Sequence, residues 1–152
     1  MRKAIFNGRE RRSYVRVDRE LPIRFRINGH PPDKIYTGVT KNISQGGLCV
    51  EIIRHQDELI ETLSSIKKQP CLEVELTLPG PNGKPGPQTG WITGRLDWLR
   101  KPAAQNPVFL IGLSFLDLHE EVRRKIYDFV LGAFLKRYQL ELRARSPVYA
   151  VR

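Results

Sequence analysis

Two short segments of the chain carry residue types that bind phosphate groups and purine bases. One is a cluster of arginines and the other is a polar turn with two glycines; together they comprise Arg11, Arg12, Arg16, Asn42, Ser44, Gly46 and Gly47. Guanidinium groups form paired hydrogen bonds with phosphate and with the O6/N7 edge of guanine, and they stack on flat rings. The turn offers an amide and a hydroxyl, and its glycines let a ligand approach the backbone closely. The two segments therefore indicate a site for a phosphorylated purine.

The sequence shows no pattern that supports catalysis or metal binding. His30, His55 and His119 have no partner at the spacing that metal ligands require. No GxSxG elbow is present, and no serine, histidine and carboxylate form a recognisable triad. The glycines of residues 80–87 are interrupted by prolines, which lack the N–H donors of a phosphate-binding loop. We expect a binding protein that is not an enzyme and needs no metal or cofactor.

Charge and composition support an anionic ligand. The 152 residues carry a formal net charge of +10, and Lys+Arg number 26 against 16 Asp+Glu, which fits one basic globular domain. The basic excess lies at both ends, with nine basic and three acidic residues in 1–26 and eight against two in 123–152. Cys49 and Cys71 lie in apolar stretches and are expected to be core residues. No apolar run approaches the roughly 20 residues of a membrane span, so the sequence predicts a cytoplasmic protein.

Alternating apolar residues predict a mainly β fold. We expect strands near 21–27, 35–42, 48–53, 72–78, 90–99 and 108–115, a short helix at 56–67 and a late helix at 119–138. This order suggests a six-stranded antiparallel β-barrel capped by the C-terminal helix, with the short helix inserted after the third strand. Residues 80–87 are expected to form only a loop. The domain division is then a flexible Arg-rich arm at 1–20, the barrel and helix at 21–138, and a basic tail at 139–152.

These features together resemble the PilZ domain, the bacterial receptor module for cyclic di-GMP. Arg12 and Arg16 match the RxxxR motif of the family, and Asn42, Ser44 and Gly47 match its (D/N)xSxxG motif. The two motifs are about 25 residues apart, and the resemblance covers roughly residues 9–135. It implies a cytoplasmic role in second-messenger signalling, such as the regulation of motility or biofilm formation.

The resemblance also implies roles for single residues. Arg12 and Arg16 would hold phosphate and guanine, Asn42 and Ser44 would hydrogen-bond the second guanine region, and Gly47 would hold the turn. Asn42 stands where many relatives have Asp, and an amide donates as well as accepts. Arg11 directly precedes the first motif, which in the family favours binding of a stacked pair of ligands. Since ordering a backbone residue costs about 1–2 kcal/mol, ligand binding is expected to be coupled to ordering of the arm.

Other interpretations of the same residues remain open. The arginines form only a solvated arm, and the turn only a β-turn, in the simplest alternative. A second is a basic barrel that binds single-stranded nucleic acid and stacks bases on Tyr14, Tyr36, Trp91 or Trp98. We expect Trp91 and Trp98 to be core residues, which weighs against it. A third is a PilZ-like adaptor that does not bind nucleotide.

The predicted C-terminal helix has more apolar surface than a cap requires. Val122, Ile126, Phe129, Val130 and Ala133 supply the stripe that faces the barrel. A second stripe consists of Tyr127, Leu131, Leu135 and Tyr138, with Phe134 between the two stripes. Either the C-terminal tail or the barrel rim covers it, or it is an interface for self-association or for a downstream protein.

Overall fold

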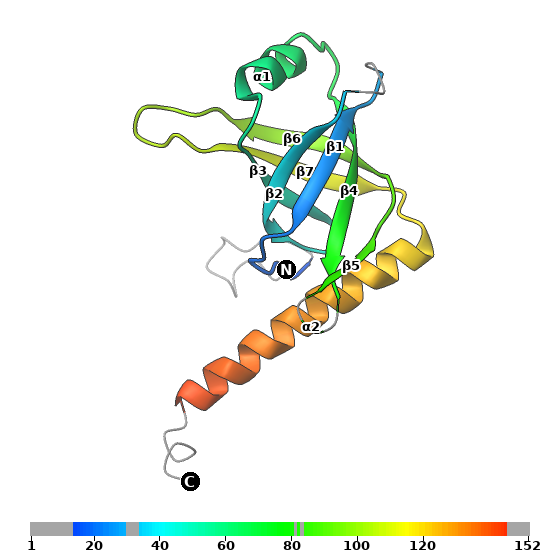
Figure 1. Ribbon diagram of the computed structural model, residues 1–152, viewed down its shortest axis with the longest axis vertical. Coiled ribbons are helices and arrows are strands. Elements are labelled where there is room, and N and C mark those ends of the chain that lie inside the picture. The colour runs from blue at the N-terminus through cyan, green and yellow to red at the C-terminus, as the bar shows by residue number, and fades with distance from the viewer. Residues whose placement is uncertain (1–13, 30–33, 81, 83, 146–152) are drawn as a thin grey trace, which may run out of the picture.

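Six antiparallel strands close into a barrel that is covered at one end by a long helix (Figure 1). The computed structural model describes residues 14–29, 34–80, 82 and 84–145. Its elements are β1 (Pro22–Ile27), β2 (Tyr36–Ile43), β3 (Gly47–Ile52), α1 (Gln56–Ser64), β4 (Cys71–Pro79), β5 (Pro85–Gln88), β6 (Ile92–Arg100), β7 (Phe109–Leu116) and α2 (Glu120–Arg145). The predicted six-stranded barrel, the short helix after the third strand and the C-terminal helix are confirmed.

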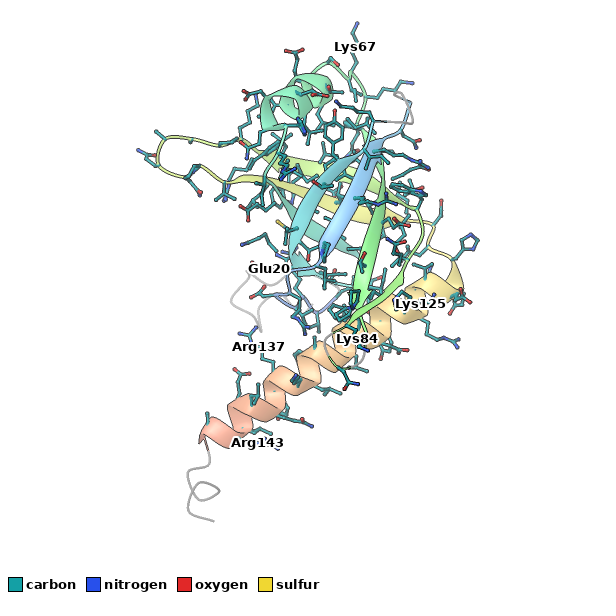
Figure 2. All side chains as sticks on the ribbon, in the orientation of Figure 1. Glu20, Lys67, Lys84, Lys125, Arg137 and Arg143 are labelled. Carbon is teal, nitrogen blue, oxygen red and sulfur yellow. The ribbon has the colours of Figure 1, made fainter. Side chains whose placement is uncertain are left out.

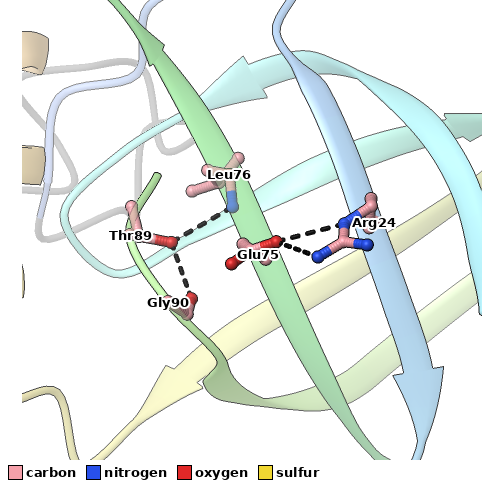
Figure 3. A network of polar contacts seen from close by, with 5 residues as sticks. All are labelled: Arg24, Glu75, Leu76, Thr89 and Gly90. Atoms are coloured by element: carbon pink, nitrogen blue, oxygen red, sulfur yellow. Dashed lines mark hydrogen bonds and ion pairs between the residues drawn. The ribbon is translucent and has the colours of Figure 1, made fainter. Parts of the chain in front are cut away.

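The barrel closes between its first and fourth strands. The strands follow the order β1-β2-β3-β7-β6-β4, and β4 pairs back with β1 in antiparallel register. An ion pair crosses this seam, in which Nε of Arg24 donates to a carboxylate oxygen of Glu75 over 3.1 Å (Figure 3). Next to it, the Thr89 hydroxyl accepts from the Leu76 N–H at 3.1 Å and donates to the Gly90 carbonyl at 2.9 Å. The Thr89 bonds fix the segment that leads from β5 to β6.

Alternate side chains of the barrel strands form the core. Ile23, Phe25 and Ile27 of β1 point inward, as do Leu72, Val74 and Leu76 of β4. Cys49 is buried and Cys71 is half-buried, and both are free thiols. Ile126 and Val130 of α2 are buried against the end of the barrel. No helix within the described residues combines the length and apolar character that a membrane crossing requires.

Three elements differ from the sequence prediction. Pro85–Gln88 is a short edge strand paired with β4 rather than loop, a position where proline is tolerated because no neighbour needs its N–H. α2 continues seven residues beyond the predicted end at Tyr138. The predicted flexible arm is anchored from Val17 onward, since Val17 is buried and exchanges two backbone hydrogen bonds of 3.0 Å with Ile43. An isolated backbone bridge of this kind leaves no periodic pattern in the sequence.

Candidate functional site

A pocket of about 250 Å³ opens on the barrel surface and contains most of the predicted site residues. Its lining residues are Tyr14, Arg16, Asn42, Ser44, Gly46, Gly47, Leu48, Cys49, Asp97, Trp98, Gly112, Leu113 and Ser114. The structure therefore brings Arg16 together with the whole predicted turn. Arg11 and Arg12 lie outside the described residues.

A β-bulge in β2 directs Asn42 toward this pocket. Thr40 pairs with Val50 and Asn42 pairs with Cys49, so Lys41 is the extra residue on β2. Thr40 and Ile43 are both buried although an odd number of positions separates them. In a regular strand Asn42 would lie on the same inward face as Thr40. The bulge shifts this register and leaves Asn42 half-buried in the wall of the pocket.

A second bulge, in β6, places Trp98 on the opposite side of the pocket. Leu96 pairs with Leu113 and Trp98 pairs with Gly112, so Asp97 is the extra residue. The alternation through Ile92 and Leu96 predicts that Trp98 is buried, but Trp98 is 46% exposed. The prediction that it belongs to the core is wrong because the bulge reverses the direction of its side chain.

Trp91 is also not a core residue. It is half-buried, and the guanidinium of Arg26 lies 4.1 Å from its ring centroid, with that of Arg24 at 5.3 Å. Trp91 precedes β6 and so does not follow the inward alternation of that strand. These two arginines of β1 contact its ring, and Trp91 does not line the pocket.

The turn between β2 and β3 is held by Ser44. The Ser44 N–H donates to the Gly47 carbonyl at 2.9 Å, and its hydroxyl oxygen accepts from the N–H groups of Gly46 and Gly47 at 3.1 and 3.2 Å. Gly47 sits against β7, where a Cβ would overlap the carbonyl oxygen of Leu113. The predicted need for glycine in this turn thus has a packing reason as well. Ser44 organises the backbone that any ligand in the pocket would meet.

The end of the arm nearest the barrel, residues 14–17, packs along this turn. The Tyr14 ring lies against Gly46, and the bridge between Val17 and Ile43 follows three residues later. The buried Thr40 hydroxyl donates to the Arg19 carbonyl at 2.7 Å and accepts from the Leu21 N–H at 2.8 Å. These contacts hold the backbone on both sides of Arg16, so the side chain of Arg16 reaches the pocket from an anchored segment.

Cys49 at the floor of the pocket lies near several charged groups, of which Arg16 lines the pocket itself. Burial raises the pKa of the Cys49 thiol, and the nearby charges of Arg16, Arg100 and Lys41 act in the opposite direction. The thiol is therefore neutral at physiological pH and serves as packing. The Asp97 carboxylate forms an ion pair with Arg95, whose Nε donates to it at 2.9 Å, and it also accepts a hydrogen bond from the Ser114 hydroxyl. The pocket favours an anion that also presents a flat surface to Trp98.

A smaller pocket of about 170 Å³ lies between the arm and α2. Its lining residues are Arg16, Val17, Phe134, Arg137, Tyr138 and Glu141. Arg16 thus lines both pockets. The guanidinium of Arg19 also lies 5.3 Å from the ring centroid of Phe129 in α2. The segment that carries Arg16 is therefore in contact with both the turn and the long helix.

Eight lining residues were not assigned to the purine site from the sequence, and four of them carry polar or aromatic side chains that a ligand could contact: Tyr14, Asp97, Trp98 and Ser114. Tyr14 and Trp98 are aromatic, and aromatic residues near arginines were a usable signal for stacking. Asp97 and Ser114 carry no such signal, because a bulge and a strand pairing bring them to the pocket. Within the described residues, no group of three or more His, Cys, Asp and Glu side chains is placed to hold a metal ion.

The chain matches a known family and several solved structures. Residues 10–132 match the PilZ domain. The Bacillus subtilis inhibitor of motility MotI/DgrA superposes with a TM-score of 0.63 at 16% identity, over 84% of this chain and 53% of that one. The PilZ domain of Escherichia coli YcgR, solved with c-di-GMP, gives a TM-score of 0.55 at 12% identity over 90% and 98% of the two chains.

A third structure is Borreliella burgdorferi PlzA in complex with c-di-GMP, with a TM-score of 0.56 and 18% identity over 93% of this chain and 57% of that one. At these identities the structural likeness shows a shared fold. The chain spans about half the length of MotI and of PlzA. No curated protein sequence matches the chain.

Proposed function

The chain belongs to the PilZ domain family, and from this premise we propose that it is a bacterial receptor for cyclic di-GMP and not an enzyme. The observation that carries the proposal is the pocket in which Arg16, Asn42 and Ser44 meet the exposed indole of Trp98. A guanidinium binds phosphate, an amide and a hydroxyl bind the edge of a base, and an indole stacks on its face. Cyclic di-GMP presents all three features.

The proposed ligand contacts follow from the position of each residue. Arg16 holds a phosphate or a guanine from the anchored end of the arm. Arg12, four residues earlier in the same motif, contacts the same ligand. Asn42 and the turn from Ser44 to Gly47 contact a guanine edge. Trp98, on the far side of the pocket, stacks on a guanine ring, a role that the sequence motifs do not include.

A compact ligand suits this surface better than an extended nucleic-acid strand. Of the four aromatic residues proposed as stacking platforms, Tyr36 is 3% exposed and stacks on Phe25, and Trp91 is covered by Arg24 and Arg26. Tyr14 and Trp98 remain, and both line the same pocket. A strand-binding barrel needs platforms spread along a groove, with one base on each.

The arm is the proposed signalling element, acting in the cytoplasm. We divide the chain into the arm at 1–20 and the barrel with its helix from residue 21, and the helix continues to Arg145, into the segment 139–152 that the sequence suggests as a tail. When the arm closes on the nucleotide, Arg16 changes its contacts in the pocket that it shares with α2. The apolar residues on the exposed side of that helix, Tyr127, Leu131, Leu135 and Tyr138, are the contact surface for a downstream protein or for self-association.

Calorimetric titration with cyclic di-GMP at physiological salt tests the receptor proposal. We expect saturable, stoichiometric binding, and Arg12→Ala or Arg16→Ala should each weaken it at least about tenfold, because each loses charged hydrogen bonds worth about 1.5–3 kcal/mol. Arg54→Ala is the matched control, since Arg54 is exposed and does not line the pocket. Absence of binding by the wild type would favour the adaptor that uses no nucleotide. Binding to single strands with a steep salt dependence and no base preference would favour the nucleic-acid alternative.

The stoichiometry of the same titration tests the proposed stacked pair of nucleotides. Arg11→Leu removes a guanidinium but keeps side-chain bulk, so it should reduce the number of bound nucleotides from two to one. A wild type that saturates at one nucleotide per chain contradicts the pair and leaves the receptor proposal intact.

A further inference from the structure

The second half of α2 is a helix with no support from the barrel. Every residue from Phe134 to Ala144 is exposed, whereas Ile126 in the first half is fully buried. Figure 1 shows the first half of α2 crossing the end of the barrel and the second half extending away from it. Arg137 and Arg143 stand on this extension (Figure 2). The packed first half of α2 nucleates this extension, but the extension leaves Leu135, Tyr138 and Leu142 exposed, so we expect a packing partner for it.

The apolar residues of the extension form one stripe. Leu131, Leu135, Tyr138 and Leu142 are separated by four, three and four residues, the spacing of a coiled-coil seam. Each is at least 38% exposed. At 100° per residue the stripe lies roughly opposite the side of the helix that buries Ile126 and Val130 against the barrel. A second helix can therefore pack on the stripe away from the barrel-facing side of α2, next to the small pocket that Tyr138 shares with Arg16 and Val17.

This spacing reads the same in both directions. The midpoint of the stripe falls between Lys136 and Arg137. If two copies meet antiparallel about that point, Leu131 lies level with Leu142 of the second copy and Leu135 lies level with its Tyr138. A twofold axis requires such self-complementarity, because each residue meets its mirror position in the sequence. The stripe has it only because the helix continues to Leu142, beyond the predicted end.

Charge also favours a second copy in antiparallel orientation. A parallel pair sets Arg143 level with Arg143 of the second copy, whereas Lys136 and Arg137 are level with basic residues in either orientation and favour neither. In the antiparallel pair, Arg143 lies within one turn of Asp128 of the second copy, and this contact occurs twice. Tyr127 and Phe134 add to the four residues of the stripe, so each copy offers six exposed apolar side chains. Counted over both copies, their contact buries on the order of 1,000 Å², near the lower limit for specific interfaces.

We infer that the extension of α2 pairs with the same segment of a second copy of this chain, as an antiparallel two-helix contact centred between residues 136 and 137. The inference deepens the proposed role of this helix surface as a protein contact. It is independent of the nucleotide, so the dimer is measured without cyclic di-GMP. A failed dimer test leaves the receptor proposal standing, and a failed titration leaves the dimer standing.

Sedimentation velocity from about 1 to 200 μM tests the inference, because an interface of this size is expected to dissociate within such a range. The wild type should shift from monomer to dimer with concentration. Leu131→Glu with Leu142→Glu should abolish the dimer, since it sets like charges level with each other. Leu140→Glu is the matched control, because Leu140 is also exposed but lies on the other side of the helix.

A charge-paired variant tests the orientation. Leu131→Glu with Leu142→Lys sets opposite charges level in an antiparallel pair and like charges level in a parallel pair. We expect it to dimerise at least roughly fivefold more tightly than the double-glutamate variant. Equal weakening of the two double variants, loss of the dimer with Leu140→Glu, or a wild type that stays monomeric throughout would each overturn the inference. Unchanged melting temperatures establish that the variants remain folded.

Discussion

The indole of Trp98 lies directly on Gly112, across the β6–β7 pair, where the Cβ of any other residue would overlap the ring. Gly112→Ala should therefore displace the indole and weaken cyclic di-GMP binding by about tenfold or more, if Trp98 stacks on a guanine. Calorimetry measures the affinity, and tryptophan fluorescence reports the displaced ring. Gly94→Ala is the control, because its added Cβ meets Leu113 at an ordinary 3.6 Å. An unchanged affinity in Gly112→Ala would remove Trp98 from the site.

Removal of the indole itself separates stacking from packing. Trp98→Ala should lower the affinity for cyclic di-GMP by about 5- to 150-fold, the effect of losing one base-stacking contact worth about 1–3 kcal/mol. The melting temperature should change little, since nearly half of the Trp98 side chain is already exposed. Trp91→Ala provides the comparison, because it removes a tryptophan that stacks on Arg26 outside the pocket. Equal losses of affinity in the two variants would indicate an indirect effect.

The two bulges mark the limit of what the sequence could predict. Alternation through Ile23, Phe25 and Ile27 predicts β1 correctly, because that strand is regular. The same rule fails at Trp98, where one extra residue reverses the face on which a side chain lies. A bulge depends on the pairing of two strands, and a single sequence does not show that pairing. Motif matching found Asn42 without knowledge of its bulge, because the motif records position and not geometry.

The end of α2 and the anchoring of the arm were also not predicted from the sequence. Apolar spacing identified the barrel-facing residues of α2, but the predicted helix ended at Tyr138 although Leu142 continues the second stripe and α2 reaches Arg145. The anchoring of the arm rests on backbone bonds between Val17 and Ile43, which depend on tertiary contact rather than on residue type. The sequence therefore predicted where charge lies better than it predicted which aromatic rings are exposed or which segments are held in place.

Thr40 should link stability to the position of the arm. Thr40→Val keeps the shape of the buried side chain but removes the acceptor of the Leu21 N–H and the donor to the Arg19 carbonyl. We expect a loss of about 1–3 kcal/mol in the free energy of unfolding, measured by denaturant titration. Affinity for cyclic di-GMP should fall as well, because the segment behind Arg16 loosens. Thr37→Val, at an exposed position of the same strand, should change stability by no more than about 0.5 kcal/mol.

Alkaline pH should destabilise the fold through two buried groups that resist ionisation. Burial raises the pKa of the Cys49 thiol and of the Tyr36 hydroxyl, so the unfolded chain releases these protons at lower pH than the folded chain does. The unfolded state then binds fewer protons, and the free energy of unfolding decreases as the pH rises above about 8.5, by at most about 1.4 kcal/mol per pH unit for each proton.

Substitution of Cys49 isolates its share of this pH dependence. Between about pH 8.5 and 10 the thiol titrates before the phenol, so Cys49→Ala should flatten the decline of stability in this interval, whatever it costs at neutral pH. Thermal unfolding at a series of pH values measures the slope. If Cys49→Ala declines as steeply as the wild type between these pH values, the buried thiol is not the source of the alkaline sensitivity.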